Sequence, residues 1–166
     1  MVPVLIRVTP ADTLATTQDR LVRRCAEELE RRGLDAEPLL DLHGLDLRMP
    51  PGPDARVFAY CVDAFLRDAE RLADDPFLGW TVAGCELRDL GLFGYSVLSA
   101  PDLRSALQLM VDLSPLLSEA ANLVLQVGEK EARLAQSLSA NAAMSQAWLR
   151  MVIGHLRELV GRGYRV

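Results

Sequence analysis

The sequence is poor in the residues from which metal centres and catalytic sites are most often built. Its 166 residues include only two histidines and three scattered cysteines. It contains no Cys-x-x-Cys, His-x-x-x-His or His-Glu-x-x-His motif that would hold a metal. The motifs of serine hydrolases, phosphate-binding loops and dinucleotide-binding folds are absent as well. We therefore expect no catalytic centre, no metal site and no cofactor.

The two histidines have ordinary structural explanations. His43 stands directly before Gly44 and is expected at the C-terminal end of a helix, where the helix dipole favours a positive charge. His155 and Glu158 share a helix face, which is typical of a solvent-exposed pair three residues apart. Neither pattern points to a metal or to a proton-transfer site.

Long apolar runs and an excess of basic residues are also missing. No run approaches the roughly 18 residues that span a bilayer, and the β-prone start at residues 2–8 is too short for a signal peptide. The formal charge is −5, and the arginines alternate with acids as on solvated helix faces. Since nucleic-acid-binding domains normally carry a Lys and Arg excess, we expect a cytoplasmic chain that itself binds neither DNA nor membranes.

The three cysteines, Cys25, Cys61 and Cys85, each stand among apolar neighbours. An odd number of scattered cysteines predicts reduced, buried thiols rather than disulfides. A Cys-His nucleophile would need one of them beside a histidine, and no local signature around any of them supports one.

Helical periodicity dominates the first half of the chain. The spacing predicts a helix from Asp19 that Gly33 ends, followed by a shorter helix that Asp35 caps and Gly44 closes. Two helices joined by a tight turn suggest a DNA-reading unit, but the second helix has no Arg, Asn or Gln to reach base edges. After a proline-rich loop, a long helix is expected to begin at Asp54. Its predicted inward side chains are Phe58, Cys61, Phe65, Ala69 and Leu72.

A glycine-rich stretch and a leucine-rich helix follow a short helix that begins at Asp75-Pro76. Gly91 and Gly94 would let backbones pack closely. Ser99, with Asp102 three residues later, is expected to cap the leucine-rich helix. The predicted buried face of that helix consists of Leu103, Ala106, Leu107, Met110, Leu113 and Leu117.

The period then changes from helix to strand. Residues 123–127 alternate in polarity, residues 128–131 form a polar turn, and residues 133–138 return, which predicts a β-hairpin. A long helix from Asn141 to Arg162 completes the chain. The fold class is therefore α+β and mostly helical, with a β-hairpin, part of a small antiparallel sheet, packed against helices. Residues 1–18 are expected to form an N-terminal arm or linker, and residues 19–166 one domain.

Three stretches resemble the N-terminal domain of one branch of AraC-type transcription regulators, often labelled the arabinose-binding-like domain. Asp89–Tyr95 reads DLGLFGY and precedes a Ser-Ala-Pro turn and the leucine-rich helix. Arg32–Asp35 reads RGLD ahead of a Leu-Leu pair, and Asp75–Gly79 reads DPFLG. The resemblance runs from about residue 21 to residue 166 and consists of apolar and turn positions.

The resemblance implies that residues 19–166 form a regulatory domain for effector binding and dimerisation, with a small-molecule effector and a second copy of the chain as partners. In the family the last helix leads into further strands and a DNA-binding region with two helix-turn-helix units. We therefore expect DNA binding only through a C-terminal region absent from this chain. A ligand-free oligomerisation or interaction module is the alternative, and an enzyme of unknown reaction is a third.

Aromatic residues make up only 5% of the chain, so the positions of the few that occur suggest where a pocket lies. Ligand sites are mostly apolar with a few polar groups, and Tyr95 and Trp148 each add a polar handle. The alternative, that these side chains only fill the core, stays open. The candidate ligand-binding residues are Phe58, Cys61, Phe65, Trp80, Phe93, Tyr95 and Trp148.

Overall fold

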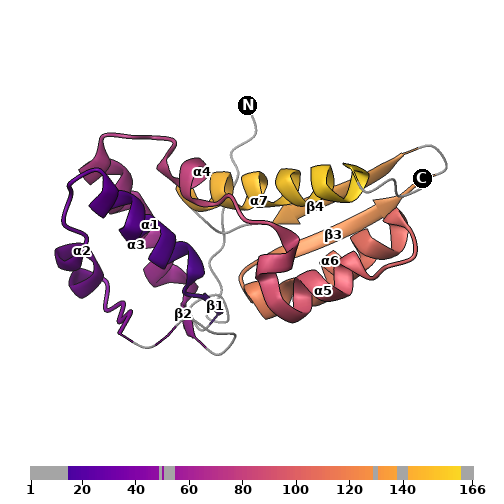
Figure 1. Ribbon diagram of the computed structural model, residues 1–166, viewed down its shortest axis with the longest axis horizontal. Coiled ribbons are helices and arrows are strands. Elements are labelled where there is room, and N and C mark those ends of the chain that lie inside the picture. The colour runs from indigo at the N-terminus through magenta and orange to yellow at the C-terminus, as the bar shows by residue number, and fades with distance from the viewer. Residues whose placement is uncertain (1–14, 49, 51–54, 129–130, 138–141, 162–166) are drawn as a thin grey trace.

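The computed structural model describes residues 15–48, 50, 55–128, 131–137 and 142–161 (Figure 1). In this part of the chain the fold is α+β and mostly helical, with two antiparallel pairs of strands, which confirms the predicted class. Three predicted regions lie outside the described residues: residues 1–14 of the expected N-terminal arm, the expected helix cap Asp54, and residues 162–166 at the end of the expected domain.

One end of the molecule, the helical lobe, gathers the first helices of the chain (Figure 1). Its elements are β1 (Thr16–Gln18), α1 (Arg20–Arg31), α2 (Glu37–Leu42), β2 (Arg56–Phe58), α3 (Ala59–Ala73) and α4 (Leu78–Val82). The short strands β1 and β2 pair antiparallel, with Thr16 opposite Phe58.

The other end, the hairpin lobe, packs helices on the predicted β-hairpin. Its elements are the 3-10 helix η1 (Leu87–Leu90), α5 (Gly91–Leu98), α6 (Leu103–Leu117), β3 (Asn122–Val127) and β4 (Ala132–Ser137). The hairpin pairs Asn122 with Ser137 and Val127 with Ala132, as the alternation predicts.

The last helix, α7 (Ala142–Gly161), connects the lobes. It runs beside the hairpin and reaches the helical lobe, where it packs against α4 and α3 (Figure 1). The buried apolar side chains of both lobes form a single connected core, to which Phe65, Met110 and Leu159 contribute. Because the core is continuous, the junction between the lobes is a packed interface and α7 is its common wall.

The predicted ends of α1 and α2 are confirmed by their hydrogen bonds. After α1, Gly33 has a φ of 77°, the Leu34 N–H donates to Leu29 O at 2.9 Å, and the Gly33 N–H donates to Glu30 O. This pattern satisfies the last carbonyls of the helix and needs a residue that tolerates positive φ. Gly44 closes α2 in the same way, with a φ of 64°.

The glycines of α5 confirm the predicted close packing at one position. A Cβ on Gly94 would lie 1.6 Å from the Leu87 carbonyl oxygen, so the backbones of α5 and η1 touch there. Gly91 has open space around it but a φ of 57°, which L side chains rarely adopt. Gly94 is therefore needed for the close backbone contact, and Gly91 is needed for its positive φ.

The predicted start of α6 is wrong. The cap is Asp102, which is extended and accepts the Ser105 N–H at 2.8 Å. Ser99 instead ends α5, and its hydroxyl donates to Tyr95 O at 2.8 Å. The reason is Pro101, which disfavours helical geometry at the residue before it and so delays the helix. The buried positions Ala106, Leu107, Met110 and Leu117 are as predicted.

The predicted start of the long helix α3 is also wrong, because β2 precedes it and the helix begins at Ala59. Phe58 is extended and 45% exposed, and its ring stacks on Tyr60 with centroids 5.6 Å apart. Leu72, near the helix end, is 42% exposed. Both were expected inside. Only Phe65 and Ala69 of the predicted inward set are fully buried.

A hydrogen-bonded joint connects β1 and β2 to the C-terminal end of α6. The Arg56 guanidinium donates to Thr16 Oγ1 at 2.7 Å and to Leu116 O at 2.8 Å. The Thr17 hydroxyl donates to Leu117 O, and the Glu119 N–H donates to Thr16 O. Terminal helix carbonyls lack partners within their own helix, so a cation here is favoured by both hydrogen bonding and the helix dipole.

Candidate functional site

A small apolar pocket lies at the junction of the lobes. Its volume is about 70 Å³ and it opens to the surface. It is walled by β1, α1, α4, η1, α6 and α7, so both lobes contribute to it. The lining residues are Thr17, Gln18, Arg20, Leu21, Arg24, Val82, Ala83, Cys85, Leu90, Leu117, Met144, Ala147, Trp148 and Met151.

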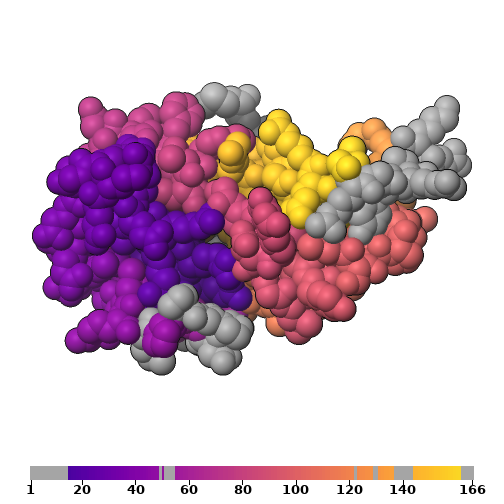
Figure 2. All heavy atoms as spheres, viewed as in Figure 1, coloured from indigo at the N-terminus to yellow at the C-terminus, as the bar shows by residue number. Residues whose placement is uncertain are grey.

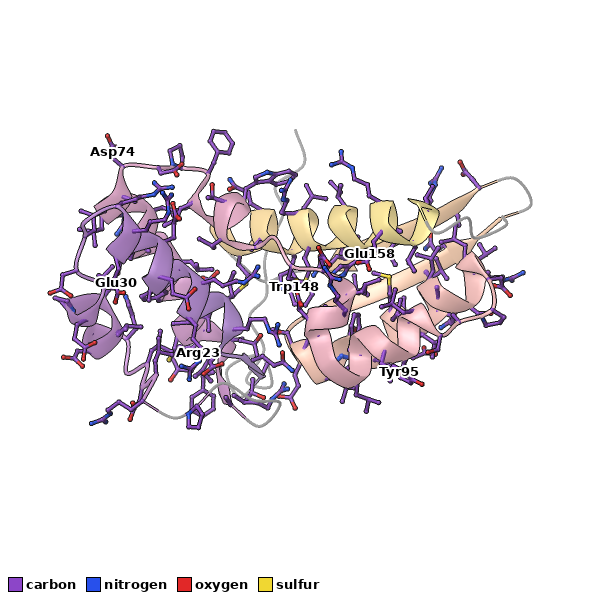
Figure 3. The ribbon with its side chains drawn as sticks, in the orientation of Figure 1. Arg23, Glu30, Asp74, Tyr95, Trp148 and Glu158 are labelled. Carbon is purple, nitrogen blue, oxygen red and sulfur yellow. The ribbon has the colours of Figure 1, made fainter. Side chains whose placement is uncertain are left out.

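Helical spacing explains why α7 supplies one whole wall. Met144, Ala147, Trp148 and Met151 follow an i, i+3, i+4, i+7 pattern and therefore share a face. The first three are buried and Met151 is half-buried. Figure 3 places Trp148 near the middle of the molecule, between the two lobes. Methionine side chains are flexible, so this wall can adapt to an occupant.

The opposite wall, from α1, carries two cations at the mouth of the pocket. Arg20 and Arg24 are four residues apart on one face, and both line the pocket. Neither guanidinium has a hydrogen bond or an ion pair with any residue that the structure describes. The neighbouring Arg23, by contrast, pairs with Asp19 at 2.6 Å and donates to Leu47 O.

An open groove with a volume of about 910 Å³ adjoins the pocket between α1 and α5. In Figure 2 the indigo atoms of α1 lie next to the pink atoms of the η1–α5 segment near the middle of the molecule. Pocket and groove share lining residues, namely Gln18, Arg20, Arg24, Leu90 and Leu117. The two arginines therefore stand where the wide groove meets the narrow apolar pocket.

Of the predicted ligand-binding residues, Trp148 lines the pocket and Phe93 lines the groove. Phe65 is a fully buried core residue. Cys61 is half-buried on α3, and Trp80 is half-buried with the Arg150 guanidinium 5.2 Å from its ring centroid.

The expectation that all these side chains surround one core is wrong for Phe58 and Tyr95. Tyr95 is 72% exposed on the outer side of α5, as Figure 3 shows, and Phe58 is exposed beside Tyr60. The structure thus does not bring the predicted set together.

Cys85 and His155 form a contact that the sequence patterns missed. His155 is completely buried, so the predicted solvent-exposed pair with Glu158 is wrong. Its Nε2 lies 3.8 Å from Cys85 Sγ, whereas Glu158 accepts the Leu87 N–H at 2.9 Å. The periodicity of α7 places position 155 on the same side as the buried Trp148 and Leu159, which was the available signal.

The protonation preferences of this contact oppose nucleophilic catalysis. Burial lowers the pKa of His155 to about 4, partly opposed by Glu158, and burial raises the pKa of the Cys85 thiol. An activated cysteine needs the reverse, a thiolate beside an imidazolium. The contact is therefore a neutral thiol against a neutral imidazole.

Three further features of the described residues are the free cysteines, the possible metal ligands and the length and hydrophobicity of the helices. Cys25 is buried, which raises its pKa to about 12, and all three cysteines are free. Within the described ranges no group of three or more His, Cys, Asp or Glu side chains converges as metal ligands would. Among the same residues, no helix combines the length and apolar character needed to cross a bilayer.

His43, expected at a helix C-terminus, is found there. It is the C-terminal cap of α2, and its Nε2 lies 2.9 Å from Asp68 Oδ2 on α3. Its ring meets Phe65 edge-on with centroids 6.4 Å apart. The pair fastens α2 to α3 and lies away from the pocket lining.

One protein-family model matches the chain. It is described as the arabinose-binding domain of AraC transcription regulators, N-terminal, and it matches residues 33–166. No curated protein gives a significant sequence match. The matched range confirms the resemblance drawn from the turn and apolar positions. It begins after α1, so the arginine-bearing wall of the pocket precedes it.

Proposed function

The chain belongs to the family of N-terminal arabinose-binding domains of AraC transcription regulators, and we propose that its small-molecule effector binds in the apolar pocket between the lobes. The observation that carries this proposal is the position of the pocket, whose wall is shared by both lobes and by α7. A ligand there contacts both lobes and α7, and a regulator would have to change how these parts are placed relative to one another.

The mechanism is a shift between two states of the pocket. At about 70 Å³ the pocket is well below the roughly 300–1,000 Å³ of ordinary ligand sites. An effector therefore binds preferentially to a state in which α7 and α1 stand further apart, and binding raises the population of that state. The altered lobe arrangement controls a helix-turn-helix DNA-binding region carried elsewhere in the full-length regulator, which acts as a cytoplasmic homodimer.

The small volume also favours a second candidate, a ligand-free dimerisation module. In that case the pocket is only a packing defect between lobes. The chain would then act through an exposed surface, and effector response would be absent from the full-length protein.

A reporter assay with a pocket-filling substitution separates these candidates. Ala147 is buried in the pocket wall, so Ala147→Leu fills the cavity while keeping the residue apolar. Ala64→Leu, on the partly exposed side of α3, is the matched control. In the full-length regulator, Ala147→Leu should abolish or lock effector-dependent transcription, and Ala64→Leu should not. An unchanged response in a folded Ala147→Leu protein would refute the pocket as the effector site.

A further inference from the structure

We propose that the effector is an amphipathic anion, with an apolar body that enters the pocket and one carboxylate held by Arg20 and Arg24. This inference rests on the proposed effector site and names its ligand class. It departs from a sugar, the ligand that the family description suggests.

The pocket wall does not suit a sugar. Every hydroxyl of a buried sugar needs a hydrogen-bond partner, and an unmatched one lowers affinity. Apart from the arginines, the polar groups of the lining are the side chains of Thr17 and Gln18, a cysteine thiol and the indole N–H of Trp148. The Thr17 hydroxyl already donates to Leu117 O at 3.1 Å, and Gln18 Nε2 donates to Leu116 O at 3.4 Å. The remaining wall is apolar and fits a hydrocarbon body.

The two arginines supply a site for one anionic head. A guanidinium pairs with a carboxylate through two parallel hydrogen bonds, and two guanidinia on adjacent turns of α1 can share it. No acidic side chain lines the pocket. The adjoining groove does include the carboxylates of Asp19 and Glu27, and Asp19 is paired with Arg23 at 2.6 Å. On the other side of Arg24, Asp89 Oδ2 accepts the Glu86 N–H at 3.2 Å and Glu158 Oε2 accepts the Leu87 N–H at 2.9 Å.

The junction of pocket and groove fixes the orientation of the ligand. Arg20 and Arg24 line both spaces, so a head bound there stays at the groove while the body points inward between Met144, Met151 and Trp148. The body widens the pocket by displacing these side chains of α7, while the head remains on α1. An amphipathic anion thus couples the two walls, which a neutral or wholly apolar ligand would do less strongly.

Calorimetric titration with matched probes tests the inference. The probes are sodium hexanoate and octanoate, the alcohols hexanol and octanol, and L-arabinose. We expect the carboxylates to bind, octanoate more tightly than hexanoate by up to roughly fourfold per methylene group. The alcohols should bind at least roughly tenfold more weakly, since they lose charge-assisted hydrogen bonds.

The double substitution Arg20→Gln/Arg24→Gln removes the proposed head site. It should weaken octanoate binding at least roughly tenfold and leave octanol binding unchanged. Arg67→Gln/Arg104→Gln makes the same change in net charge at exposed positions of α3 and α6, outside the pocket lining, and should leave both unchanged.

The opposite result is that octanol or L-arabinose binds as tightly as octanoate, with binding lost in Ala147→Leu but retained in the arginine double variant. That result would overturn the anionic effector and leave the pocket as the effector site. Failure of octanoate to bind in the millimolar range would also overturn it. The reporter assay with Ala147→Leu then judges the pocket separately, because it uses the natural effector response and none of these probes.

Discussion

Gly91 and Gly94 stand three residues apart in α5, yet a side chain is costly at each for a different reason. At Gly94 an added Cβ meets the Leu87 carbonyl at 1.6 Å, and backbone has no rotamer by which to move aside. Gly94→Ala should therefore lower the free energy of unfolding by about 2 kcal/mol or more. Gly91→Ala should cost about 1–2 kcal/mol through its positive φ alone.

Thermal melts of both variants check this, with Gly84→Ala as control. Gly84 has open space and no positive φ, so its substitution should leave the melting temperature unchanged. A Gly94→Ala protein that melts with the wild type would show that α5 and η1 do not touch there.

His155 gives the domain a specific sensitivity to acid. Its folded pKa, about 4, lies below the ordinary value of 6.5, so between these pH values the unfolded chain binds the extra proton. The contribution of neutral His155 to the free energy of unfolding should therefore be fully present above about pH 6.5. It should fall as the pH drops toward 4, by roughly 3 kcal/mol in total.

Urea unfolding between pH 7.5 and 5 measures this slope. His155→Gln should lose some stability at pH 7.5 but show a much flatter pH dependence. His43→Gln, at the chain's other histidine, is the control and should keep the slope that His155 causes. An equally steep slope in His155→Gln would place the acid sensitivity elsewhere.

At the scale of elements, Arg56 on β2 is joined to β1 by a hydrogen bond to Thr16 and to the end of α6 by a hydrogen bond to Leu116. Arg56→Gln should destabilise the domain by about 1.5–3 kcal/mol, because carbonyls at the helix end lose a charged donor. Arg56→Lys should restore little, since one ammonium does not reproduce the spread of a guanidinium. Arg104→Gln, on the exposed surface of the same helix, should change stability little. Full rescue by lysine in chemical unfolding would contradict the geometric role.

Elements with local signals could be predicted, and elements that depend on distant partners could not. The Gly33 and Gly44 helix ends, the hairpin and α7 are all encoded by neighbouring residues, and they appear where the sequence predicts. Strands β1 and β2 have three residues each and pair across about forty positions, so no local pattern announces them. The predicted start of α6 was wrong because the conformational effect of Pro101 outweighed the Ser-x-x-Asp capping pattern.

The candidate site shows the same limit more strongly. Trp148 was predicted because it is a rare aromatic residue with a polar handle. Arg20 and Arg24 looked like part of a solvated helix face, and only the placement of α7 and η1 beside α1 turns that face into a pocket mouth. Cys85 and His155 are likewise brought together across 70 residues.

At the scale of the whole molecule, the acidic balance of the chain disfavours direct DNA binding. The formal charge of −5 and the pairing of many arginines with acids leave little basic surface for phosphates. The isolated chain should therefore show no sequence-specific DNA binding at physiological salt. A gel-shift titration checks this, and a tight, sequence-dependent shift by this chain alone would contradict it.

Trp148 offers the most direct measurement of the central claim, that the lobe junction is the effector site. The chain has two tryptophans, so Trp80→Phe leaves Trp148 as the only indole reporter. Titration of this variant with octanoate should change the Trp148 emission saturably, with the affinity found by calorimetry, and Ala147→Leu should abolish the change. Octanoate binding that calorimetry detects but that leaves the Trp148 emission unaltered would place the ligand elsewhere and contradict the account.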